Sequence, residues 1–184
     1  MFNREQALAL LKDHTSEEHL LHHALETEAV MRHLARELGE DETVWGLTGL
    51  VHDIDYAQTK ETPEQHGVLG AQMVADHLPD EALQAIRAHN SEMTGVAATT
   101  RLDFALRCGE TVTGLVRASA LVRPNKMEGL KPKSLKKKIK DKSFAANVSR
   151  ERLAECDRIG LEQGAFLQLA ITAVQEIAAE VGLE

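Results

Sequence analysis

Apolar side chains along this chain recur every three or four residues, which is the spacing of one buried face on an α-helix. One such stripe lies within residues 16–38, a second begins near Asp41, and the longest lies within residues 100–122. Alternation with a period of two, which would indicate a strand, never extends beyond a few residues. The pattern therefore predicts an all-α fold, a compact bundle of six to eight helices with irregular crossings.

Polar residues mark where several of these helices should begin and end. Thr15, Thr62 and Thr100 each stand three residues before an acid or an amide, which is the spacing of a capping box at a helix N-terminus. The helix that opens at Thr15 should end at Gly39, because glycine commonly follows a helix C-terminus. Pro79 should separate two further helices.

The one shift in composition along the 184 residues is a lysine run over residues 131–142. It holds seven lysines and one aspartate, whereas the whole chain has a net charge of −8. We expect this run to separate a helical core over residues 1–128 from a C-terminal helical appendage over residues 129–184. The appendage should contain a short helix from about residue 149 and an amphipathic helix over residues 161–181, packed on the core as one structural domain.

The charge pattern also limits the expected partners. A lysine run is usually a solvated face, although lysines can also steer a polyanionic substrate. No aromatic residue lies among these lysines, so base stacking is not indicated, and the net charge of −8 argues against a general nucleic-acid coat protein. Nucleic acid is therefore not an expected partner, and the sequence makes no prediction of an oligomeric state.

Membrane and secreted classes are not favoured either. No stretch approaches the length of apolar sequence that a spanning helix requires, and the first five residues do not begin an apolar signal segment. Cys108 and Cys156 are the only cysteines, too few for a disulfide framework or a thiolate zinc site. We therefore expect a soluble protein of a reducing compartment, the cytoplasm, without a membrane partner.

The most informative candidate chemistry is the pair His52-Asp53, an imidazole beside a carboxylate within an apolar stretch. Burying such groups costs free energy unless they are paired or bind a metal. Taken alone, the pair is also typical of a buried hydrogen bond between two helices. Upstream, His23 lies on an apolar helical stripe, where a lone histidine is more often a core residue than a ligand, and His19 lies one turn earlier on nearly the same face.

Three further residues extend this pattern downstream. We expect His66 in the first turn of the helix opened at Thr62, and His89 at the end of a later helix, and each would be unremarkable there as a helix-end residue. Glu110 falls on the longest predicted helix, where pairing with Arg107 or a nearby arginine is the simpler role. Together, however, imidazoles and carboxylates suit Zn, Fe, Mn or Ni better than Ca.

The order of these residues resembles the HD-domain family of metal-dependent phosphohydrolases. The pattern is a histidine, a histidine–aspartate pair, two further histidines and an acid, and its specificity is higher for the fold than for the substrate. The residues in this order are His23, His52-Asp53, His66, His89 and Glu110.

The resemblance has consequences for individual positions. It favours His23 over His19 as the first histidine of the motif, and it implies that His66 and His89 are the extra histidines of members that hold two metals. The chain departs from the family at Glu110, where an aspartate is usual. Glutamate is one methylene longer but still supplies an oxygen ligand.

By this resemblance, one or two divalent transition-metal ions (Mn, Fe, Ni, Co or Zn) are the expected cofactor. His23, His52 and Glu110 would hold one ion, His66 and His89 the other, and Asp53 would bridge them. The catalytic candidates are Asp53 and Asp55; Asp55 would orient a water or a ligating imidazole, and an exposed helix-end acid is its alternative. The cationic candidates for binding phosphate are Lys60, Arg117, Arg123 and Lys126.

The function that the resemblance implies is metal-dependent hydrolysis of a phosphoester by an activated water. The expected substrate is a nucleotide or a related small molecule. Two alternatives stay open: a non-catalytic module of the same fold that binds a nucleotide or a protein, and a di-iron oxygenase of the same fold.

Overall fold

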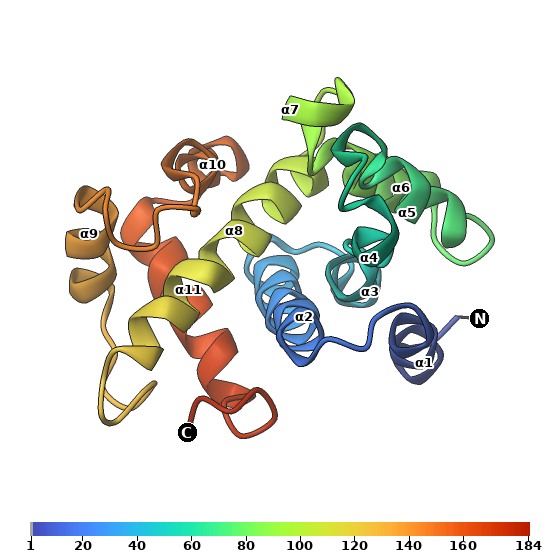
Figure 1. Cartoon of the computed structure of the whole chain (residues 1–184). Coiled ribbons are helices and arrows are strands. Elements are labelled where there is room, and N and C mark those ends of the chain that lie inside the picture. Colours follow the sequence, from blue (N-terminus) through green and yellow to red (C-terminus); the bar gives the residue numbers. More distant parts are fainter. Residues whose placement is uncertain (1) are drawn as a thin grey trace.

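The computed structural model describes residues 2–184, whose regular secondary structure is helical throughout, without a β-strand. This confirms the all-α class. Figure 1 follows the chain from α1 at one edge, past α3–α6, along the central α8 and on to α9–α11 at the opposite side. Residues 2–184 form more helices than the six to eight predicted, because several are only one turn long. Their bounds are α1 Arg4–His14, α2 Glu18–Leu38, α3 Glu42–Val51, α4 Tyr56–Thr59, α5 Val68–Met73, α6 Asp80–Ala88, α7 Ser91–Thr94, α8 Arg101–Leu121, α9 Pro132–Lys140, α10 Arg150–Ala154 and α11 Gln163–Glu176, with 3₁₀-helices at Pro63–Gln65 and Glu155–Ile159.

Several helix ends lie where the capping chemistry predicts them. α2 ends at Leu38, and Gly39 follows in the left-handed conformation with φ of 73°. α8 begins after Thr100, whose side chain accepts the backbone N–H of Asp103 while the Asp103 carboxylate accepts the backbone N–H of Thr100. α10 follows Ser149, whose hydroxyl accepts a backbone N–H of the first turn. Local capping patterns therefore placed the boundaries at Gly39 and Thr100, and the helix start expected near residue 149 is confirmed.

The capping box predicted at Thr15 is wrong. Thr15 is buried and follows the last residue of α1, and its backbone N–H donates to the Leu11 carbonyl. α2 instead begins after Glu17, which makes no side-chain bond to the helix.

The capping box predicted at Thr62 is also wrong. Thr62 makes no side-chain cap bond, and the residues after it form only a 3₁₀-helix. The longer helix begins at Val68, after Gly67 with φ of 89° interrupts the turn. His66 therefore lies between two helices rather than in the first turn of one.

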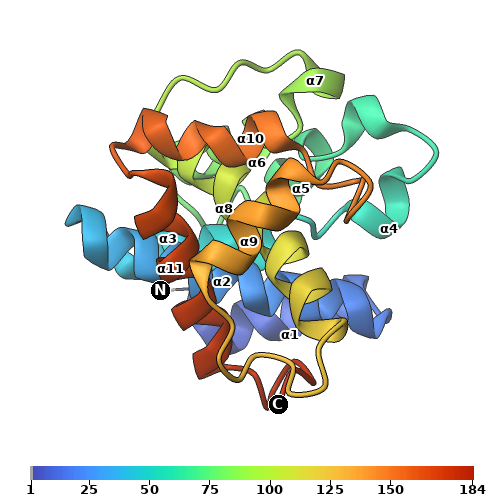
Figure 2. The ribbon, with the colours of Figure 1, turned by 90° about the vertical axis from the view of Figure 1, so that its left-hand side faces the viewer.

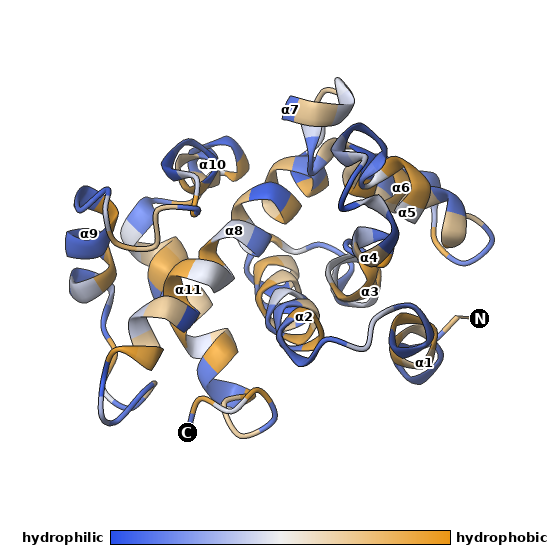
Figure 3. Cartoon of the chain, viewed as in Figure 1, coloured by the Kyte–Doolittle hydropathy of each residue, from blue (hydrophilic) through white to orange (hydrophobic). Residues whose placement is uncertain are grey.

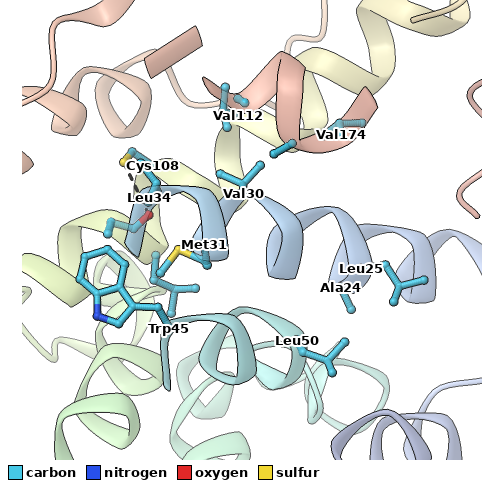
Figure 4. Packing of buried hydrophobic residues seen from close by; sticks show 14 of the residues in the cluster. Ala24, Leu25, Val30, Met31, Leu34, Trp45, Leu50, Cys108, Val112 and Val174 are labelled. Atoms are coloured by element: carbon cyan, nitrogen blue, oxygen red, sulfur yellow. Dashed lines mark hydrogen bonds between the residues drawn. The ribbon is translucent and has the colours of Figure 1, made fainter. Parts of the chain in front are cut away.

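The core forms where α2 packs between α3 and α8, with α11 against a further side of α2. Figure 4 shows Val30 and Met31 of α2 in one buried cluster with Trp45 of α3, Val112 of α8 and Val174 of α11. Figure 2 shows the C-terminal helices from their outer side, in front of α8. Because this cluster draws on both α2 and α11, it spans the boundary at residue 128 that the lysine run suggested.

Two glycines on α3 allow it to lie directly against α2. A Cβ on Gly49 would lie 2.9 Å from Cγ of Met31 and 3.0 Å from the backbone oxygen of Thr27. A Cβ on Gly46 would lie 2.7 Å from Cγ of Arg32. The close approach brings the residues that follow α3 within reach of the N-terminal half of α2.

The lysine run forms the amphipathic helix α9, which the sequence analysis did not predict. Leu135 is fully buried and Ile139 is partly buried where α9 packs on α8 and α11. Figure 3 shows the rest of α9 as mostly hydrophilic. Apolar packing on one face is enough to form this helix despite the like charges on the other. Within residues 2–184, no helix has the combination of length and apolar character needed to cross a membrane.

Candidate metal centre

Four histidines from separate parts of the chain surround one carboxylate, that of Asp53. His23 lies on α2, His52 directly follows α3, His66 follows the 3₁₀-helix beyond α4, and His89 directly follows α6. His52 and Asp53 directly follow the last residue of α3, and His52 keeps a helical backbone conformation with φ of −58° and ψ of −32°. The structure thus brings together five of the predicted site residues.

The Nε2 atoms of all four imidazoles face the Asp53 carboxylate. Oδ1 of Asp53 lies 3.3 Å from Nε2 of His52, 3.2 Å from that of His66 and 3.3 Å from that of His89. Oδ2 lies 3.7 Å from Nε2 of His23. Two ligand atoms that are each about 2.0–2.2 Å from one ion stand roughly 3 to 3.5 Å apart, so this spacing fits metal ligation.

These atoms form two candidate groups of metal ligands that share Asp53. The first group is His23, His52 and Asp53, and the second is Asp53, His66 and His89. In each group one donor atom per residue lies within 4.8 Å of the others. Imidazole nitrogen with carboxylate oxygen is a donor set for divalent transition metals. The residues present therefore fit one or two such ions.

The second nitrogen of each imidazole, Nδ1, also has a polar partner. Such a contact orients the ring and leaves Nε2 free for a metal, as in metal sites where ligating histidines are held from behind. The partners of Nδ1 are the Gly49 carbonyl for His52 at 2.8 Å, the Ile86 carbonyl for His89 at 2.6 Å, Oδ1 of Asp55 for His66 at 2.9 Å and Oγ1 of Thr113 for His23 at 3.0 Å.

Asp55 is fully buried and organises the loop that carries His66. Its Oδ1 accepts the hydrogen bond from His66, and its Oδ2 accepts the backbone N–H groups of Gly67 and Gly70, both at 2.8 Å. A Cβ on Gly67 would lie 2.5 Å from the Ile86 carbonyl oxygen, so this close approach requires glycine. The alternative of an exposed helix-end acid is wrong for Asp55, because both of its oxygens are engaged inside the protein.

Burial and neighbouring charges move the pKa values of these groups apart. Burial lowers the pKa of His52 to about 4, even with Asp53 beside it. Burial also opposes the charged form of His66, but hydrogen bonds to Asp53 and Asp55 outweigh it and raise the pKa of His66 to about 10. Burial would raise the pKa of Asp53, yet the imidazoles of His52, His66 and His89 hold it well below its ordinary value. The carboxylate at the centre is therefore charged at neutral pH.

Glu110 lies outside both candidate groups. Its Oε1 accepts hydrogen bonds from Oγ1 of Thr111 at 2.8 Å and from Nη1 of Arg152 at 3.0 Å. Its Oε2 accepts no hydrogen bond from residues 2–184. An arginine does pair with Glu110, as the simpler interpretation held, but it is Arg152 rather than Arg107. Ligation of a metal by Glu110 stays a prediction.

A cavity of 420 Å³ opens beside His23. One wall comes from α8, and the opposite wall comes from residues 147–152, which the sequence analysis assigned to the appendage. The lining is polar and charged and contains no phenylalanine, tyrosine or tryptophan. Its residues are His23, Glu92, Glu110, Thr111, Gly114, Asn147, Val148, Ser149 and Arg152.

None of the four cations predicted to bind phosphate lines this cavity. Each is engaged by other groups of the protein, two of them by carboxylates and two by backbone carbonyls. Their partners are Glu17 for Lys60, Glu26 for Arg117, the Lys126 and Glu128 carbonyls for Arg123, and the Gly182 carbonyl for Lys126.

Two arginines near the centre, Arg107 and Arg152, have roles that the sequence does not predict. Arg107 is buried and donates to the carbonyl oxygens of Ala88 and His89, both at 3.2 Å, so it holds the end of α6 that carries a candidate ligand. Arg152 reaches the cavity from α10. No local pattern marks either residue, because their roles depend on how α8 and α10 pack in three dimensions.

Comparison with protein families agrees with this geometry. The family model described as HD domain matches residues 20–141. This chain belongs to the HD domain family. The matched range contains all four histidines of the centre together with Asp53 and Glu110. The resemblance stated from the sequence is therefore confirmed.

Curated relatives of this HD domain protein bear the name Ribonuclease Y. The one from Desulfotalea psychrophila is 27% identical over 163 residues, which are 85% of this chain and 31% of the relative. The one from Lactobacillus acidophilus is 33% identical over 102 residues, 54% of this chain and 19% of the relative. The one from Enterococcus faecalis is 27% identical over 136 residues, 73% of this chain and 26% of the relative.

The chain thus spans no more than 31% of the length of these three relatives. No solved structure matches the chain. The sequence predicts that nucleic acid is not a partner. Because these relatives are named as ribonucleases, the comparison does not support that prediction.

Proposed function

We propose that this chain is a metal-dependent phosphohydrolase that cleaves a phosphoester of a nucleotide or a related molecule. The observation that carries the proposal is the convergence of four imidazole Nε2 atoms on the Asp53 carboxylate. One imidazole is enough for a structural hydrogen bond with an aspartate. Two groups of metal ligands that share one carboxylate would need several imidazoles. Membership of the HD domain family supports the same function.

In this proposal His23, His52 and Asp53 hold one ion, and Asp53, His66 and His89 hold the second. Glu110 is a further oxygen ligand on the His23 side. When bound, such ions lower the pKa of a coordinated water toward about 7 and neutralise charge on phosphate oxygens.

The protein's own residues keep the ligand atoms in place. Asp55 and Thr113 hold the rings of His66 and His23 from behind. His52 and His89 are 1% and 3% exposed, whereas the side chains of His23, Asp53 and His66 are 25%, 18% and 14% exposed, so water reaches the centre at these three residues. Asp55 acts as a positioning residue, because it is fully buried and both of its oxygens accept hydrogen bonds from the protein.

An RNA phosphodiester is a second candidate substrate. The relatives named Ribonuclease Y favour it, and the same donor set would serve a diester. A polar cavity without aromatic rings suits a sugar–phosphate backbone better than base stacking. In both cases residues 129–184 are more than an appendage, since they supply a wall of the substrate cavity.

The test is a hydrolysis panel run on the full chain with Mn, Fe, Ni, Co or Zn. The substrates are bis(p-nitrophenyl) phosphate, nucleoside monophosphates, cyclic nucleotides, a dinucleotide and a short single-stranded RNA. We expect cleavage of at least one substrate, lost in EDTA and in Asp53→Asn. Full metal occupancy without any cleavage would indicate a non-catalytic binding module. Iron-dependent oxygen consumption without cleavage would indicate an oxygenase.

A further inference from the structure

Arg152 is the only arginine or lysine that lines the cavity beside His23. Its side chain is 19% exposed, and carboxylates take three of its N–H directions. Nη1 donates to Oε1 of Glu110 at 3.0 Å, Nη2 donates to Oε2 of Glu92 at 2.6 Å, and Nε donates to Oε1 of Glu92 at 3.3 Å. The guanidinium therefore already presents two parallel N–H groups to a bidentate anion, the Glu92 carboxylate.

Arg107 connects α10, the helix that carries Arg152, to the candidate metal centre. Nε and Nη2 of Arg107 donate to the two carboxylate oxygens of Glu155, at 2.7 and 2.8 Å. Its Nη1 donates to the carbonyl oxygen of His89 at 3.2 Å. Because Glu155 directly follows α10, this arginine joins the base of α10 to a candidate metal ligand. Arg152 is thus held at a fixed place relative to the centre.

The two carboxylates that hold Arg152 differ in freedom. The Glu110 side chain is 14% exposed, whereas that of Glu92 is 51% exposed and lies on the one-turn helix α7. Glu92 also accepts hydrogen bonds from Nη2 and Nη1 of Arg107, at 2.7 and 3.2 Å, which break if Glu92 turns toward solvent. Arg107 would then keep its bidentate pair with Glu155, and Nε and Nη2 of Arg152 would become available inside the cavity. Glu92 therefore occupies the position that a ligand anion would take.

We propose that Arg152 binds a phosphate group of the substrate in this cavity, where the phosphate takes the place of the Glu92 carboxylate. The inference deepens the proposed function and rests on it. Phosphate matches the fork of a guanidinium as a carboxylate does and carries more charge, so it can compete for the same two N–H groups. Arg152 is then the substrate-binding cation that the four sequence candidates do not supply.

Substitutions of Arg152 and of Glu92 test the proposal through the direction in which each changes phosphate affinity. Arg152→Gln and Glu92→Gln both break the pair of Arg152 with Glu92. Arg152→Gln also breaks the pair with Glu110, and Glu92→Gln also breaks the pair with Arg107. A purely structural role of this network therefore predicts weaker phosphate binding in both variants. A binding role predicts opposite effects, because one removes the phosphate partner and the other removes its competitor. Arg158→Gln is the matched control, since Arg158 is exposed and stacks on Phe104 at 4.4 Å outside the cavity lining.

The experiment is titration of inorganic phosphate into the full chain as purified, followed by calorimetry, with the metal content of every variant measured in parallel. We expect phosphate affinity to fall about tenfold or more in Arg152→Gln, as the loss of a charge-assisted hydrogen-bonded pair predicts. We expect it to rise about threefold in Glu92→Gln and to stay within about twofold in Arg158→Gln. Metal content should be equal in all four proteins.

Three results would overturn the inference: no phosphate binding by the parent chain, equal weakening in both ion-pair variants, or weaker binding that follows a loss of metal in Arg152→Gln. The hydrolysis panel separates this failure from failure of the proposed function. Phosphate binding in the expected pattern without any cleavage would contradict the phosphohydrolase and retain the role of Arg152. Cleavage by the parent chain, together with unchanged phosphate affinity in Arg152→Gln, would support the phosphohydrolase and contradict the role of Arg152.

Discussion

Two polar clusters meet at the C-terminal end of α6, and their charged groups are arranged differently. In the histidine cluster, four imidazoles point at the single carboxylate of Asp53. In the arginine cluster, Arg107 and Arg152 alternate with carboxylates, and each charge faces an opposite one. The members of the arginine cluster are Arg107, Arg152, Glu92, Glu110 and Glu155.

The difference shows what each cluster can do. The arginine cluster is satisfied by the protein's own charges, so it can fix helices relative to one another without a ligand. The histidine cluster offers four Nε2 atoms for two carboxylate oxygens, and a further cation would give these nitrogens a common partner. We therefore propose metal binding for the histidine cluster, and for the arginine cluster the positioning of the histidine cluster and of a substrate anion.

The substitution with the largest expected effect removes the shared carboxylate of the histidine cluster. Asp53→Asn should lower turnover of any substrate by roughly 10³-fold or more, because both metal groups lose a charged ligand at once. The helix content should not change, since asparagine has nearly the same size and shape as aspartate. Steady-state kinetics and circular dichroism measure these two effects. Asp76→Asn, at an exposed position, is the control; equal turnover in both variants would move the active centre elsewhere.

Substitutions in the arginine cluster should instead lower the free energy of unfolding. Arg107→Met leaves two carboxylates and two backbone carbonyls without their buried partner, so we expect the free energy of unfolding to fall by about 3–5 kcal/mol. Arg101→Met on the same helix removes an exposed pair with Glu40 and should cost less than about 1 kcal/mol. Denaturant unfolding of both variants tests the contrast. Similar losses would mean that the buried network contributes no more than a surface pair.

Asp55→Asn tests whether the histidine cluster depends on its supporting contacts. The amide oxygen can still accept both backbone N–H groups of Gly67 and Gly70, but the amide NH2 then faces Nδ1 of His66 and can only donate to it, which leaves the ring proton on Nε2, the atom that would bind the metal. We expect metal affinity to fall about 10- to 100-fold, the usual effect of losing a contact that orients a ligand. Metal titration by calorimetry measures it. An unchanged affinity would show that His66 is not a ligand or needs no support.

Glu110 stands between the two clusters, and we expect its substitution to have the smallest effect on metal binding. Glu110→Gln should weaken metal affinity by about threefold to tenfold, because a neutral amide replaces a charged oxygen ligand. Glu110→Asp should retain the affinity, since it keeps the charge and restores the side chain that is usual in the family. Measured metal content of both variants against the parent decides the point. Equal content in all three would assign Glu110 to the arginine cluster alone.

The sequence predicted the histidine cluster much better than the arginine cluster. His52-Asp53 and the three other histidines form a pattern of residue types that ligand chemistry makes recognisable, and helical periodicity placed His23 on an inward face. The helix boundaries at Gly39 and Thr100 followed from local capping. These features depend on neighbours close in sequence, or on residue types that are rarely gathered by chance.

What the sequence did not predict depends on tertiary packing. Arg152 reaches the cavity only because α10 packs on α8, and nothing near residue 152 marks that contact. Asp55 became a buried hydrogen-bonding centre because Gly67 and Gly70 fold back on it. The helix predicted to begin at Thr62 does not form because Gly67 adopts a positive φ. Gly67 has this conformation where it packs closely against the end of α6.

The central claim is that Asp53 joins two metal groups, and counting bound ions tests it most directly. We predict two transition-metal ions per chain in the parent, one in His89→Ala, where only the group of His23, His52 and Asp53 is intact, and none in Asp53→Asn. Elemental analysis after equilibration with Mn and gel filtration gives these numbers, and thermal unfolding gives the accompanying stabilisation. A parent chain that takes up no ion and is not stabilised by Mn, Fe, Ni, Co or Zn would contradict the account, as would equal ion content in all three proteins.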